Sequence, residues 1–147
     1  MAITQSLCNV FTQDCMLGQQ NLTGGAIKLA LYTTDATLNA DTTVYTTSNE
    51  VVGAGYAAGG NTLTGATVSL TVTSSRSIAY VNFSDTTWTL SKITARGALI
   101  YNASNSKAIA VLDFGANKTS SGGDFTVKFP VNNSTNALIR LGYSPTA

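Results

Sequence analysis

The chain contains no histidine, and only 10% of its 147 residues are charged. Histidine is the commonest general base and metal ligand, so its absence removes histidine-based nucleophilic sites and the usual zinc sites. A pair of carboxylates facing each other at about 5 to 9 Å is the remaining catalytic option. We predict no catalytic, metal or cofactor site, and hence no enzyme, because only seven acidic residues are present: Asp14, Asp35, Asp41, Glu50, Asp85, Asp113 and Asp124.

Clustered positive charge is also missing. The eight lysines and arginines are scattered and the net charge is +1, which argues against a nucleic-acid partner. The chain begins without the basic and apolar stretches of a signal peptide, and no run of about 18 apolar residues could span a membrane. We therefore expect a protein that stays in a cytoplasm until it is assembled. A net charge near zero suits assembly, because it gives weak self-repulsion.

The chain has two cysteines, Cys8 and Cys15. In a helix, seven residues would place them about 10 Å apart along the axis. A disulfide needs Cα atoms within about 7 Å, so the two cannot pair within an intact helix. We interpret them as reduced, half-buried thiols on one helix face, and a bridge to a neighbouring subunit is the alternative.

One helix is predicted, over about residues 5–17. Leu7, Val10, Phe11 and Leu17 give it an approximate apolar face. Thr4 is a candidate N-cap, and Gly18 stands where a helix often ends in a left-handed residue. So short a helix must pack against the body or against a partner to be stable.

From residue 26 onward the pattern of apolar residues changes to a period of two. This predicts short antiparallel strands, each with one buried face, at about 27–32, 68–72, 78–83, 93–101, 107–114, 125–129 and 138–141. Gly- and Asn-rich turn signals separate them, including 102–106 and 120–123. The predicted fold is a single all-β domain over 1–147, an antiparallel β-sandwich or jelly roll of about eight strands with one short N-terminal α-helix.

A long irregular segment spans residues 34–60. Its apolar anchors predict an ordered loop with at most one short strand. Tyr45 and Tyr56 in this loop could contact a partner, since tyrosine is enriched at interfaces, or they could fold the loop onto its own body. Trp88, the only tryptophan, is interpreted as a core or edge anchor, with a sugar-stacking platform as the alternative.

Several segments resemble one family of small virion structural proteins from tailed bacteriophages and prophages. They are spread in order along most of the chain: Met1-Ala-Ile-Thr-Gln5, Ile27-Lys-Leu-Ala-Leu-Tyr-Thr33, Asn49-Glu50-Val51, Gly53-Ala-Gly55-Tyr56, Ala58-Gly59-Gly60, Thr87-Trp88, Ala95-Arg96-Gly97-Ala98-Leu99-Ile100-Tyr101 and Leu112-Asp113-Phe114-Gly115. The resemblance implies a component of a virus particle, and it supplies no catalytic residues.

Within a particle, a compact and nearly neutral β domain suits a capsid decoration or cement protein. Its expected partners are the major capsid protein or other virion subunits, and it is expected to be a homo-oligomer. The candidate contact residues are Cys8, Phe11, Cys15, Tyr45, Tyr56 and Trp88. The alternatives are a neck, tail or fibre-associated subunit, a host-attachment adhesin, and a carbohydrate-binding module.

Overall fold

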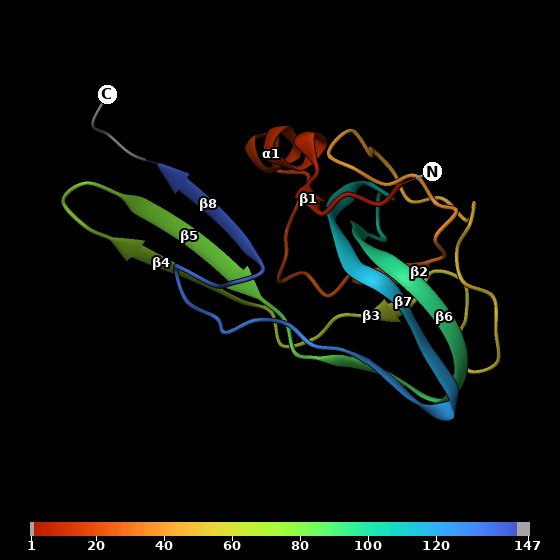
Figure 1. The fold of residues 1–147 in the computed structure, drawn as a ribbon. Helices are drawn as coiled ribbons and strands as arrows, with labels where there is room; N and C mark the ends of the chain where they lie inside the picture. Colours follow the sequence, from red (N-terminus) through yellow and green to blue (C-terminus); the bar gives the residue numbers. More distant parts are fainter. Residues whose placement is uncertain (1, 144–147) are drawn as a thin grey trace.

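The computed structural model describes residues 2–143, which form eight strands and one short helix in two antiparallel sheets (Figure 1). The five-stranded sheet has the order β1-β7-β6-β2-β3, and the three-stranded sheet has the order β4-β5-β8. This confirms the predicted all-β, sandwich-like class. In chain order the elements are β1 (Ser6–Leu7), α1 (Asn9–Met16), β2 (Ile27–Tyr32), β3 (Asn61–Thr62), β4 (Thr67–Val72), β5 (Ser77–Asn82), β6 (Thr86–Asn102), β7 (Ala108–Val127) and β8 (Ile139–Tyr143).

The helix is shorter than predicted. It spans Asn9–Met16, and Cys8 rather than Thr4 occupies the N-cap position. Residues 3–8 are instead held in extended form by other segments of the same chain: the Thr4 amide donates to the Leu38 carbonyl, and the Cys8 amide donates to the Ile109 carbonyl, both at 2.9 Å. The predicted helix end is confirmed, because Gly18 has a φ of +71°.

The largest element is the hairpin of β6 and β7, which are 17 and 20 residues long. The turn predicted at 102–106 joins them, but the second predicted turn, at 120–123, lies inside β7 and is wrong as a turn. There Ser120 is opposite Ile93, and its hydroxyl bonds to the Ser91 hydroxyl at 2.7 Å. The polar stretch can remain in the sheet because its buried hydroxyls satisfy one another.

β2 is buried on both faces, whereas the sequence predicted one buried face. Leu29 and Leu31 belong to the larger apolar cluster, and Ala30 and Tyr32 belong to a second cluster on the other side of the sheet. The second cluster also contains Ile3, Cys8, Ala36 and Leu38, so the N-terminal segment and the start of the long loop cover that face.

The three-stranded sheet projects away from the five-stranded sheet (Figure 1). One of its faces carries most of the apolar residues of the three strands, and Ile78 lies on the other face. That face is buried at Val81 of β5 and Ile139 of β8, which are each 3% exposed, and open along β4, where Val68 is 54%, Leu70 62% and Val72 67% exposed. The prediction that Val68, Leu70 and Val72 line a buried face is therefore wrong: the alternation is present, but nothing in the described chain covers it.

Candidate interaction surface

Tyr45 and Tyr56 hold the long loop on the body through one buried carboxylate, Glu50. The Tyr45 hydroxyl donates to Glu50 Oε2 and the Tyr56 hydroxyl to Oε1, both at 2.6 Å, and the Gly59 amide also donates to Oε1, at 2.7 Å. The Tyr56 hydroxyl in turn accepts the Leu31 amide of β2 at 2.9 Å. We call this group the Glu50 clasp.

The clasp favours the second role considered for the two tyrosines, which is to fold the long loop onto its own body. Burial, and then the hydrogen bond to Glu50, raises the pKa of both Tyr45 and Tyr56, so both stay protonated donors. Tyr45 also stacks on Tyr101 with ring centroids 4.5 Å apart. A Cβ at Gly60, whose φ is +74°, would lie 1.8 Å from the Leu29 carbonyl oxygen, so only glycine fits where the loop rejoins β2.

Trp88 is a core anchor, as the sequence analysis favoured. Its side chain is 4% exposed and lies between Tyr56 and Phe125, with ring centroids 5.8 Å and 6.2 Å away. An indole covered in this way presents no platform on which a sugar could stack.

The helix residues proposed as contact points are mostly covered by their own chain. Phe11 and Cys8 are fully buried, so neither side chain is available to a partner of the folded subunit. Burial raises the pKa of the Cys8 thiol to about 11. Cys15 is half-buried; burial and then the neighbouring Asp14 raise its pKa. Both cysteines are free thiols.

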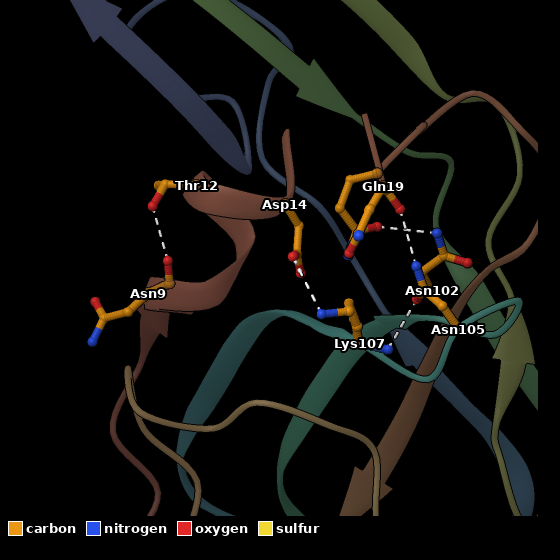
Figure 2. A network of polar contacts seen from close by, with 8 residues as sticks. Asn9, Thr12, Asp14, Gln19, Asn102, Asn105 and Lys107 are labelled. Atoms are coloured by element: carbon orange, nitrogen blue, oxygen red, sulfur yellow. Dashed lines mark hydrogen bonds and ion pairs between the residues drawn. The ribbon is translucent and has the colours of Figure 1, made fainter. Parts of the chain in front are cut away.

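Asp14 fixes α1 to the turn between β6 and β7, a role that the sequence analysis missed. Figure 2 shows Lys107 of that turn next to Asp14, with the ammonium nitrogen 3.3 Å from the carboxylate oxygen Oδ1. The Asp14 side chain is 1% exposed. In the same turn, the side-chain amide of Asn105 donates a hydrogen bond to the Gln19 carbonyl at 3.0 Å. The only sequence signal was an acidic residue within an apolar helix face, which is too common to identify a buried ion pair.

The open part of the three-stranded sheet is the clearest uncovered apolar surface. Cross-strand pairing places Leu70 opposite Ala79, and Ala79 opposite Leu141, so these three share one face. Val68 and Val72 lie on the same side of β4. We call these five residues the apolar face. No charged residue occurs from 67 to 73. β4, the outer strand that carries three of these five residues, is therefore uncharged.

The opposite side of this sheet is more polar and carries Ser69, Thr71 and Arg140 beside Ile78. It borders a hollow of about 500 Å³ between the sheets, lined on this side by Arg76, Ile78 and Arg140 and on the other by Gln5 and Leu112. No aspartate or glutamate lines the hollow. Among residues 2–143, no group of three histidine, cysteine or acidic side chains could hold a metal ion.

Neither the family models nor the curated proteins nor the solved structures contain a match to this chain. No helix within the described residues is both long enough and apolar enough to cross a membrane.

Proposed function

We propose that this chain is a structural subunit of a bacteriophage particle, and that it works by binding other protein subunits through the apolar face. The observation that carries this proposal is the exposure of Leu70 and Val72 on a sheet whose other strands reach the closed core at Val81 and Ile139. A contiguous apolar patch on a folded protein marks an interaction site. The resemblance to small phage virion proteins supplies the kind of particle.

Within the particle, we propose a capsid decoration or cement role, with the major capsid protein as the partner. Apolar side chains at the centre of the contact would supply most of the binding energy, and the threonines and serines around them would form a polar rim. The Glu50 clasp keeps the long loop folded without a partner, so the body is formed before the subunit docks. Binding then orders no large segment, which reduces its entropic cost.

The decisive experiment is the copy number of this chain in purified particles, measured by quantitative mass spectrometry against the major capsid protein. A ratio near one, or a simple fraction of it, supports decoration of the capsid lattice. A ratio of a few per cent supports a neck, tail or fibre-associated subunit, including a host-attachment adhesin. Absence of the chain from particles would refute the virion proposal.

A matched pair of variants connects the copy number to the apolar face. Leu70→Ser should lower the amount of chain bound to particles, because it removes an exposed apolar anchor. Ser69→Ala, on the opposite face of the same strand, should leave the amount unchanged. Equal retention of both variants would mean that another surface makes the contact.

A further inference from the structure

The outer edge of β4 is an open β-strand edge. β4 pairs with β5 only, with no shift in register, and no other strand within residues 2–143 pairs with it. Exposed edges are normally protected against pairing by lysines, prolines or bulges. The sequence of β4, Thr-Val-Ser-Leu-Thr-Val, contains none of these. An unprotected regular edge is a ready template for another strand.

The phase of the ladder shows which backbone groups point outward. The Thr73 amide donates to the Arg76 carbonyl at 2.8 Å across the turn, so this pair is hydrogen-bonded. Hydrogen-bonded pairs alternate along an antiparallel ladder, so Thr71 and Ser69 also direct their amides and carbonyls toward β5. Val68, Leu70 and Val72 therefore direct theirs toward the open edge.

We propose that the occupant of this edge is β4 of a second copy of the chain, paired antiparallel about a twofold axis at Leu70. In this register Leu70 faces Leu70 of the other copy, and Val68 faces Val72. Every outward amide and carbonyl of these three residues then finds its partner. The two sheets join into one six-stranded sheet.

The charges and side chains also fit a second copy. Residues 67 to 73 carry no charge, so the twofold arrangement brings no like charges together. The three apolar side chains of each β4 lie on the same side of the sheet, so they form direct cross-strand pairs. The β8 edge lacks this neutrality because it carries Arg140. A contact that uses the same patch on both subunits also closes after two copies.

The pairing rests on the proposed function and extends it, because the dimer places the apolar faces of two copies on one side of the joined sheet. A single strand pair buries less than the roughly 800 Å² per partner of a standard stable interface, so the dimer should dissociate on dilution. On a particle surface, two linked faces would bind more tightly than one, because the second contact forms at high effective concentration.

The first test is sedimentation equilibrium of the purified full chain over a wide concentration range. The wild type should be a reversible dimer. Leu70→Lys places two lysines directly opposite each other and should raise the dissociation constant about tenfold or more. Ser69→Lys is the matched control; its side chain is on the other face and opposite Thr71 of the second copy, so its dimer should persist. A wild type that is monomeric at every concentration, or a dimer that both variants weaken equally, overturns the proposal.

The second test reads the register directly, in a Cys15→Ser background that leaves only the buried Cys8. Leu70→Cys should form a disulfide-linked dimer on mild oxidation, because paired Cα atoms lie about 5.5 Å apart. Val72→Cys has the same face and a similar exposure. In this register the two Val72→Cys residues of the dimer would be four residues apart along the strand, about 13 Å, and should not form a disulfide. Equal cross-linking of the two overturns the register. Both tests use isolated protein, so they can fail while the particle copy number still supports the virion role.

Discussion

In the five-stranded sheet β2 is buried on both faces, whereas in the three-stranded sheet β4 exposes the face that carries its apolar residues. Both strands have six residues and alternate larger apolar side chains with other residues. The difference lies in what the rest of the chain supplies. The N-terminal segment and the long loop cover the second face of β2, and no described segment reaches the outer end of β4. The apolar face of a strand can therefore be covered by its own chain or be left open, as it is in β4, for the contact proposed above.

The largest expected effect comes from truncating a leucine in each sheet. Leu99→Ala in β6, where the leucine is completely buried, should lower the free energy of unfolding by about 2–5 kcal/mol. Leu70→Ala in β4 should change it by no more than about 0.5 kcal/mol. Urea unfolding of both variants, at concentrations low enough to keep the chain monomeric, measures the contrast. Equal losses would mean that the outer end of β4 is covered in the isolated chain.

The Glu50 clasp is the next most sensitive point, because it keeps one side of β2 covered. Glu50→Gln replaces an acceptor of three short hydrogen bonds by a group with one acceptor oxygen, and should cost about 1–3 kcal/mol. Residues 34–60 should then become the first site of limited proteolysis. Asp35→Asn makes the same charge change at an exposed position of the same loop and should do neither.

Alkaline pH should weaken the body, where Cys8 is buried and Tyr45 and Tyr56 form the clasp. Burial raises the pKa of Cys8 from 9.0 to about 11, so the folded state favours the protonated thiol. Its contribution to stability is full below pH 9 and is lost as the pH rises toward 11. Tyr45 and Tyr56, whose pKa values are also raised, act in the same direction. Unfolding measured from pH 8 to 11 should show a falling free energy, with a shallower fall for Cys8→Ala. A flat profile would contradict the burial of these groups.

The smallest effect is expected at the surface of the five-stranded sheet, where Arg96 and Asp113 form an ion pair at 3.0 Å. Asp113 also accepts the Gly115 amide, and these contacts lower its pKa. Asp113→Asn should cost less than about 1 kcal/mol near neutral pH, because the pair is partly solvated. The difference in stability between the wild type and Asp113→Asn should disappear as the pH falls through the lowered pKa of Asp113, and added salt should reduce this difference. Thermal unfolding at two salt concentrations provides the measurement.

The sequence predicted the class of fold because period-two alternation and glycine-rich turns are local signals. It could not predict which faces would be covered, because that depends on segments far away in the chain. Ala30 and Tyr32 were expected on an open face and lie under the N-terminal segment; Leu70 was expected inside and lies outside. The turn expected at 120–123 failed for a similar reason, since the buried partner of Ser120 is Ser91, 29 residues earlier. Of the six candidate contact residues, the fold uses Cys8, Phe11 and Trp88 in its core and Tyr45 and Tyr56 in the clasp.

The connection between the two sheets has a mechanical consequence. Three segments join the sheets: β3 leads into β4 through residues 63–66, β5 into β6 through residues 83–85, and β7 into β8 through residues 128–138. A load applied to the projecting sheet would therefore enter the body through β3 and through the open end of the β6–β7 hairpin, where Thr86 lies opposite Val127. A pull that separates these two strand ends would open the cross-strand hydrogen bonds one after another from that end, whereas a pull on both ends in one direction would leave the bonds unloaded. The direction of the load therefore decides how well the body resists it.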